Sequence, residues 1–177
     1  MCDAGAPEAR PYARRYARWA AWCGARPTLA RALGAANRAI VWVFYASFAV
    51  LLALEAARDP VRLVPLVGIL GVAFALVSLV RARIDAPRPY ERDGVSPLIA
   101  RDGAGRSLPS RHAFSAFAIA AGWWCASPAV SVGLGAAAVV LAALRVAGGV
   151  HYPRDVVAGA ALGLAAGAIA AACALAL

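Results

Sequence analysis

The sequence predicts an all-α, multi-pass transmembrane helical bundle of about five spans, preceded by an N-terminal segment at the membrane interface. Of the 177 residues, 63% are apolar and only 15% are charged. A soluble domain of this size cannot bury so much apolar surface. The apolar residues also fall into long runs without charge, and one bilayer span takes roughly 20 residues of helix. Together these observations indicate a protein that crosses a membrane several times.

Four uncharged apolar runs define the predicted spans. They are residues 39–54, 63–80, 113–144 and 156–177. The third run is long enough to fold back on itself, and Pro128 within Ser127-Pro128-Ala129 is the expected turn. This turn raises the predicted number of spans to five.

Residues 1–38 form the first of two predicted regions, and residues 39–177 form the second, which is embedded in the membrane. The first region interleaves arginine with tyrosine and tryptophan at roughly helical spacing, a pattern typical of a helix lying on a membrane surface. Pro11 and Pro27 interrupt this pattern. A disordered basic tail therefore remains the alternative.

The net charge of +9 comes from eighteen arginines, because the chain has no lysine. Many of these arginines flank the apolar runs, where they are expected to meet lipid headgroups, so we expect membrane lipids and no nucleic acid as partners. The four cysteines, Cys2, Cys23, Cys125 and Cys173, are widely separated. Their spacing fits neither a metal site nor a disulfide framework.

Two polar loops are the expected location of function. The longer loop covers residues 81–111 and the shorter one residues 148–155. Because two predicted spans separate them, both loops should lie on the same membrane face. In the last span, Gly159, Gly163 and Gly167 repeat every four residues, which predicts close packing against another helix.

The chain has only two histidines, His112 and His151, and each lies where a polar loop meets an apolar run. Asp155 follows His151 by four residues, so its carboxylate can reach one imidazole nitrogen if a helix begins at Pro153. A carboxylate that fixes the tautomer leaves the other nitrogen free to attack. Arg145 lies at the end of an apolar run, where a charge is costly. It is therefore a candidate functional residue.

Further arginines and a helix-capping serine predict a phosphate site. Arg81, Arg88 and Arg145 carry forked donors that match phosphate oxygens. Ser110 can cap the helix of the third run, whose first amide groups favour a bound anion. Since both loops are expected on one face, these residues and the histidines can converge on one phosphoryl group.

The order of these residues resembles the type 2 phosphatidic acid phosphatase superfamily, also called lipid phosphate phosphatases, and within it the small bacterial membrane branch. The first motif of that family is lysine, six residues, then Arg-Pro, and here it runs from Arg81 to Arg88-Pro89. The second motif, Pro-Ser-any-His, is matched in full by residues 109–112. Arg81 replaces the lysine of the family, which keeps the positive charge.

The third motif of the family is Ser-Arg, five residues, His, three residues, Asp. Arg145, His151 and Asp155 match it, whereas Leu144 replaces the serine. That replacement removes any hydrogen bond from the serine hydroxyl. The resemblance covers about residues 63–177.

The resemblance implies a phosphoric ester or diphosphate hydrolase that acts on a lipid phosphate without a cofactor or a metal. It implies that His151 attacks phosphorus to form a phosphohistidine, that Asp155 orients His151, and that His112 protonates the leaving oxygen and then activates water. It also implies a set of residues that bind the phosphoryl oxygens. These are Arg81, Arg88, Ser110 and Arg145.

Several alternatives stay open at the level of the sequence. The same site could transfer a phosphoryl group to another lipid, or the chain could be a non-catalytic phosphate-binding membrane protein. Vanadate-dependent haloperoxidases share the motifs, but they are soluble. The small size favours a polyprenyl diphosphate such as undecaprenyl diphosphate as substrate, with phosphatidylglycerol phosphate and phosphatidic acid as alternatives. We expect a multi-pass protein of the cell membrane, and its oligomeric state stays open.

Overall fold

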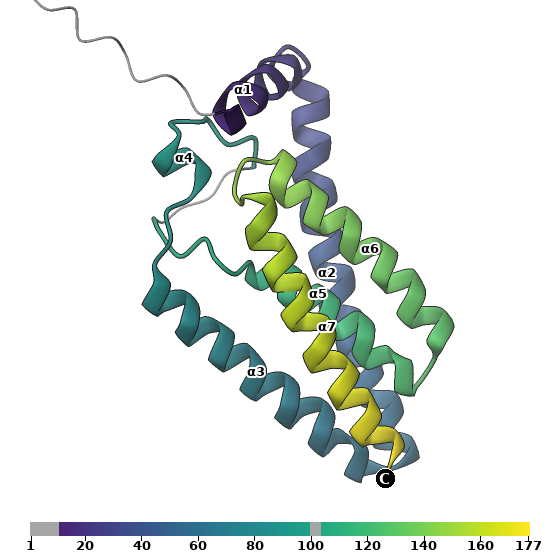
Figure 1. Ribbon diagram of the computed structural model, residues 1–177. Coiled ribbons are helices and arrows are strands. Elements are labelled where there is room, and N and C mark those ends of the chain that lie inside the picture. Colours follow the sequence, from purple (N-terminus) through teal and green to yellow (C-terminus); the bar gives the residue numbers. More distant parts are fainter. Residues whose placement is uncertain (1–10, 100–103) are drawn as a thin grey trace, which may run out of the picture.

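The computed structural model describes residues 11–99 and 104–177, and every regular element within these ranges is a helix (Figure 1). The elements are α1 (Pro11–Gly24), α2 (Pro27–Arg58), η1 (Pro60–Arg62), α3 (Leu63–Ile84), α4 (Pro89–Arg92), α5 (Arg111–Gly122), η2 (Trp123–Cys125), α6 (Pro128–Ala147) and α7 (Pro153–Leu175). The predicted all-α class is confirmed.

Among the described residues, four helices are long and apolar enough to cross a membrane, and they contain α2, α3, α6 and α7. Their outer faces are apolar, as shown by Trp42, Val64, Val132 and Val157, which are 65–70% exposed. Apolar side chains directed outward in this way fit lipid rather than water. The chain is a multi-pass membrane protein.

The remaining predicted span is α5, a shorter helix at the centre of the bundle. α5 has 12 residues and continues into the three residues of η2. It packs against all four of the longer helices, and most of its residues are buried. The turn expected at Pro128 is present, because α6 begins there and the Ser127 hydroxyl accepts a hydrogen bond from the Val130 amide at 3.4 Å.

The N-terminal region contains a helix that lies across one end of the bundle (Figure 1). Residues 1–10 of this region lie outside the described residues. The helix α1 buries Ala13, Tyr16 and Cys23 and turns its arginines outward. α2 begins at Pro27, before the apolar run that starts at residue 39, because proline suits the first turn of a helix.

A buried ion pair closes the opposite end of the bundle, where α2 turns into α3. Glu55 is fully buried, and its carboxylate lies 2.9 Å from Nη1 of Arg58 and 3.6 Å from Nη1 of Arg62. An acid at this depth requires such partners. The functional residues predicted from sequence lie at the other end.

The predicted glycine ridge of α7 is confirmed as a packing surface against α5. A Cβ atom added to Gly159, Gly163 or Gly167 would collide with the backbone of α5, at the carbonyl oxygens of Ser110, Phe114 and Ala118 respectively. The two helices can therefore approach this closely only because these positions lack a side chain.

We predict that Gly163→Ala lowers the free energy of unfolding by about 1–3 kcal/mol, because the added methyl group overpacks the contact with α5. Gly133→Ala on α6 is the matched control, since a Cβ there meets open space. The control should leave the melting temperature unchanged or raise it, because alanine favours a helix. Thermal unfolding in detergent measures both, and a Gly163→Ala protein that melts no earlier than the control would contradict the packing role.

Candidate active site

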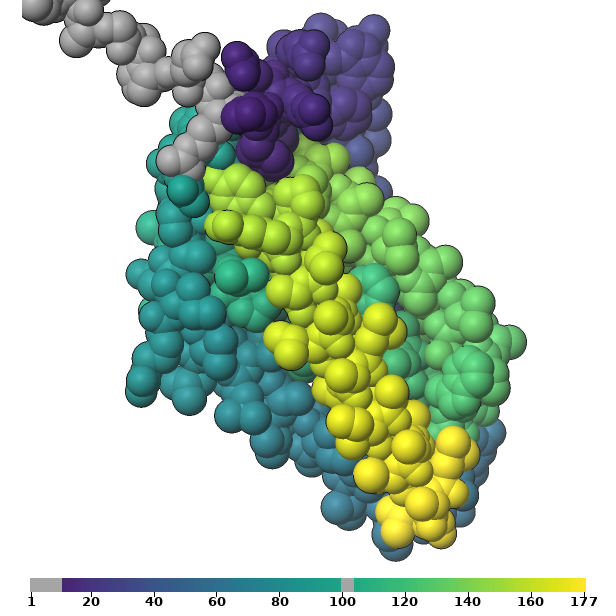
Figure 2. Space-filling model, in the orientation of Figure 1, coloured from purple at the N-terminus to yellow at the C-terminus, as the bar shows by residue number. Residues whose placement is uncertain are grey.

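The two polar loops meet beneath α1, at the end of the bundle where α5 and α7 begin (Figures 1 and 2). The backbone amide of Ser110, which caps α5, donates to the carbonyl of Asp155 in the first turn of α7 at 2.9 Å. The amide of Leu98 donates to the carbonyl of Gly148 at 3.0 Å. These bonds bring both loops together at the same end of the bundle, as their expected position on one membrane face requires.

His151 lies fully buried just before α7, which begins at Pro153 as predicted. Its Nδ1 atom is 3.7 Å from Oδ2 of Asp155 and 3.4 Å from Oγ of Ser107. Its Nε2 atom is also buried and has no hydrogen-bond partner among residues 11–99 and 104–177. One ring nitrogen therefore lies beside two polar side chains, whereas the other makes no hydrogen bond within the described part of the chain.

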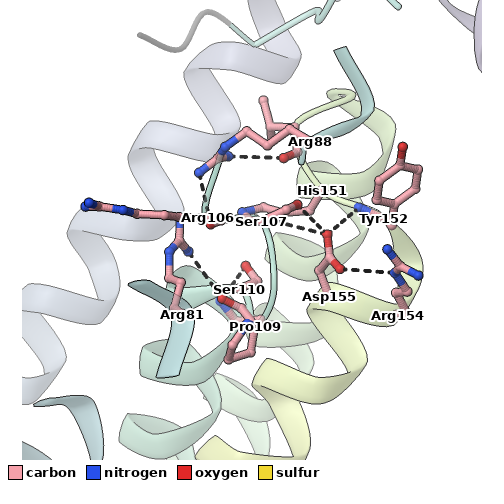
Figure 3. Close-up of polar contacts among 12 residues, drawn as sticks. Arg81, Arg88, Arg106, Ser107, Pro109, Ser110, His151, Tyr152, Arg154 and Asp155 are labelled. Atoms are coloured by element: carbon pink, nitrogen blue, oxygen red, sulfur yellow. Dashed lines mark hydrogen bonds and ion pairs between the residues drawn. The ribbon is translucent and has the colours of Figure 1, made fainter. Parts of the chain in front are cut away.

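Ser107 is a member of this site that the sequence patterns did not predict. It is fully buried, and its hydroxyl donates to Oδ2 of Asp155 at 2.5 Å (Figure 3). The amide of Tyr152 donates to the same oxygen at 3.0 Å. A serine in a polar loop carries no spacing signal of its own, so only the three-dimensional contact identifies it.

Arg81 and Arg88 are buried and hold the loops through backbone carbonyl groups. Arg88, which is 1% exposed, donates to the carbonyl oxygens of Gly105 at 2.8 Å and Val150 at 3.2 Å. Arg81, at the end of α3, donates to the carbonyl of Pro109 at 3.2 Å. Both guanidinium groups thus lie beside the ends of the loops that carry His151 and Ser110 (Figure 3).

Arg145 lies in the last turn of α6 and is 3% exposed. Its Nη1 atom donates to Oδ1 of Asn37, a buried residue of α2, at 3.4 Å. This contact comes from a helix that the family motif does not include. Asn37 therefore gives Arg145 a polar neighbour in a chain where Leu144 replaces the serine of the motif.

Ser110 and His112 begin α5, and the Ser110 hydroxyl accepts a hydrogen bond from the Ala113 amide at 3.5 Å, as predicted. His112 is half-buried and lies on the walls of two cavities. One is a cleft of about 690 Å³ that Arg145 also lines, and the other is a groove of about 250 Å³ among apolar side chains.

The helix α1 covers this site, which the sequence patterns did not predict. The Tyr16 hydroxyl donates to the carbonyl of Ser96 and accepts from the amide of Leu98, both at 3.2 Å. Trp19 donates from its indole nitrogen to the carbonyl of Ala147 at 2.9 Å. α1 is thereby fixed to the longer loop and to the end of α6, beside the shorter loop.

Electrostatics keep the His151 ring neutral. The pKa of the imidazole is lowered to about 4, chiefly because burial disfavours the charged ring, and the nearby charges of Arg145 and Arg88 also lower it. The Asp155 carboxylate acts in the opposite direction. Among the described residues, no three His, Cys, Asp or Glu side chains gather as a set of metal ligands.

Comparison with known proteins identifies the family. Residues 62–176, well over half of the chain, match the family model described as the PAP2 superfamily. The chain belongs to the PAP2 superfamily. This confirms the resemblance drawn from the three motifs. The matched region includes every site residue predicted from the sequence.

Two solved structures show the same fold. The crystal structure of Aquifex aeolicus LpxE has a TM-score of 0.63 and 24% identity, with 81% of this chain and 92% of that chain covered. A transmembrane PAP2 type phosphatidylglycerolphosphate phosphatase from Bacillus subtilis has a TM-score of 0.50 and 19% identity, with coverage of 90% and 92%. No curated protein sequence matches the chain.

We predict that His151 titrates at about pH 4, compared with roughly 6.5 for an ordinary histidine. Between these values the unfolded chain binds a proton that the folded chain does not. Stability is therefore lost as the pH falls through this interval. NMR titration of protein labelled with ¹⁵N-histidine in detergent measures the value, and His112→Asn assigns the two rings. Titration of His151 at or above the ordinary value would contradict the buried, neutral ring.

Proposed function

We propose that this protein hydrolyses a lipid phosphate or diphosphate through a phosphohistidine intermediate on His151. The observation that carries the proposal is the state of its ring. Nε2 is buried without a hydrogen-bond partner among the described residues, while Nδ1 faces Asp155 and Ser107. A neutral imidazole with one available nitrogen beside cationic side chains is suited to attack a phosphate.

In the first proposed step, Nε2 of His151 forms a bond to phosphorus and the bond from phosphorus to the leaving oxygen breaks. His112 donates its proton to that oxygen. In the second step, His112 takes a proton from water, the water oxygen attacks phosphorus, and the bond to His151 breaks to release phosphate. Asp155 orients His151 throughout.

Positive charge for the transition state comes from side chains in this proposal, and no metal or cofactor is required. Arginine donors and helix amides that already point at the phosphoryl oxygens stabilise the charge that develops there. The residues assigned to this role are Arg81, Arg88, Arg145 and Ser110.

The groove beside His112 supports a substrate with a hydrocarbon chain. Its walls include Phe44 from α2, Phe74 from α3, and Ile119 and Leu141 from α5 and α6. If His112 protonates the leaving oxygen, the leaving group must lie on the His112 side of the phosphorus atom. A hydrocarbon chain attached to that oxygen can then enter the apolar groove.

The larger cleft favours a diphosphate substrate, such as a polyprenyl diphosphate. A phosphate monoester, whose leaving group is uncharged, would make less use of it. Arg31, Asn37 and Arg38 of α2 line it together with His112 and Arg145. Nη1 of Arg38 lies 3.9 Å from the position that a Cβ atom would take on Gly34. The guanidinium group therefore turns back along α2 into the cleft. A leaving group that carries its own phosphate would meet these cations.

We predict that His151→Ala lowers phosphate release from a prenyl diphosphate in detergent micelles by roughly 10⁴-fold or more, as for loss of other catalytic nucleophiles. His112→Ala should slow turnover severely and accumulate phosphorylated protein, because release of the intermediate needs its base. Assays in excess chelator test the metal-free proposal at the same time. Near wild-type phosphate release by a folded His151→Ala protein would refute the mechanism.

We predict that the double variant Arg31→Gln, Arg38→Gln raises KM for a prenyl diphosphate by roughly tenfold, the effect of losing one charge-assisted hydrogen bond. KM for the prenyl monophosphate of the same chain length should change much less. The double variant Arg14→Gln, Arg18→Gln is the control. These arginines lie exposed on α1, and their substitution removes the same amount of positive charge from the same end of the bundle. An equal rise in KM for both substrates would argue against a diphosphate as the preferred substrate.

A further inference from the structure

We infer that Ser107 is a positioning residue for the nucleophile. Its hydroxyl oxygen accepts a hydrogen bond from Nδ1–H of His151, and its own proton is donated to Asp155. The inference rests on the proposed function insofar as His151 is the nucleophile. It assigns a role to a residue outside all three sequence motifs.

The three distances among these side chains decide the direction of the hydrogen bonds. Oγ of Ser107 is 2.5 Å from Oδ2 of Asp155 and 3.4 Å from Nδ1 of His151, whereas Nδ1 and Oδ2 are 3.7 Å apart. A hydroxyl has one proton and two lone pairs, and the short contact with the carboxylate uses the proton. Towards His151, Ser107 therefore presents only a lone pair.

A lone pair facing Nδ1 favours the tautomer that carries its proton on Nδ1. That tautomer leaves Nε2 unprotonated, which is the form that can attack phosphorus. Asp155 is beyond ordinary hydrogen-bond distance of the ring, so its influence on the tautomer is transmitted through the serine hydroxyl.

The backbone holds this hydroxyl in place without help from His151. The amide of Ser107 donates to the carbonyl of Ala86 at 2.8 Å, and the amide of Arg106 donates to Oδ1 of Asp85 at 3.1 Å. Arg88 donates to the carbonyl of Gly105 at 2.8 Å. A hydroxyl on such a fixed backbone is preorganised to orient the ring.

The arrangement also suits the charged intermediate. When Nε2 bonds to phosphorus, the ring becomes a cation that keeps its proton on Nδ1, and no proton has to leave it. Ser107 continues to accept a hydrogen bond from Nδ1–H, and the negative charge of Asp155 lies at the other end of the same hydrogen-bonded chain. The cation is therefore stabilised without any movement of the protein.

The test compares Ser107→Ala with Ser131→Ala in the full-length protein. Ser131 is the matched control, because its hydroxyl is also buried and donates a hydrogen bond, to the carbonyl of Ala120 at 2.7 Å, away from the site. We expect Ser107→Ala to lower kcat roughly 10- to 100-fold, the range for loss of a hydrogen-bond partner of a functional histidine. KM should change little, and the control should keep wild-type activity.

The decisive readout is the tautomer of His151, measured by ¹⁵N NMR at about pH 8, where the ring is neutral. In Ser107→Ala the proton should shift partly from Nδ1 to Nε2, and in the control it should stay on Nδ1. Ser107→Cys, which keeps a weaker hydrogen-bonding group at this position, should give intermediate values. This variant serves if the alanine variant does not fold.

Two results would overturn the inference. One is an unchanged tautomer with turnover equal to that of Ser131→Ala, which would make Ser107 a packing residue. The other concerns the double variant Ser107→Ala, Asp155→Asn. If the two residues act in series, its kcat should fall no further than that of Asp155→Asn alone. A fall in kcat equal to the two single-variant factors multiplied together would show that they act independently. The tautomer is read without substrate, so an inactive wild-type protein would refute the proposed function and still leave this measurement as a test of Ser107.

Discussion

The close approach of α5 and α7 is the constraint on which the rest of the structure depends. Three glycines of α7 let its backbone lie against that of α5, and at the upper end of this contact the Ser110 amide bonds to the Asp155 carbonyl. Since Ser110 begins α5 and His151 immediately precedes α7, the spacing of the two helices fixes the spacing of the two loops. A bulkier residue in the ridge would move the start of α5 away from His151.

Buried arginines connect this packing to the chemistry. Arg88 and Arg81 donate to backbone carbonyl groups of both loops, so the same cations that are proposed to bind phosphate also hold the loops in position. Burial within a membrane protein makes each such charge costly unless it is hydrogen-bonded. Polar backbone at this depth is tolerated because it is enclosed by protein. In the proposed mechanism, stability and catalysis at this end of the bundle therefore depend on the same few side chains.

The parts of the site that could be predicted from sequence are those encoded by local spacing. Uncharged runs predicted the spans, and the interval from His151 to Asp155 predicted a contact within one helical turn. Contacts between distant segments could not be predicted in this way. Asn37 meets Arg145 from 108 positions away, and Ser107 meets Asp155 from 48 positions away. Neither residue belongs to a periodic pattern, so its partner is known only from the fold.

The cover formed by α1 has a consequence for the order in which the protein is built. α1 precedes the other described helices in the chain. Its partners come much later, because Ser96 in the longer loop lies 80 positions after Tyr16 and Ala147 at the end of α6 lies 128 positions after Trp19. The cover cannot close until α6 has been made and inserted. Until then the aromatic face of α1 has no protein partner and can rest on the membrane surface. The first described helix is thus among the last elements to reach its final position, and it covers the site only after α6 is in place.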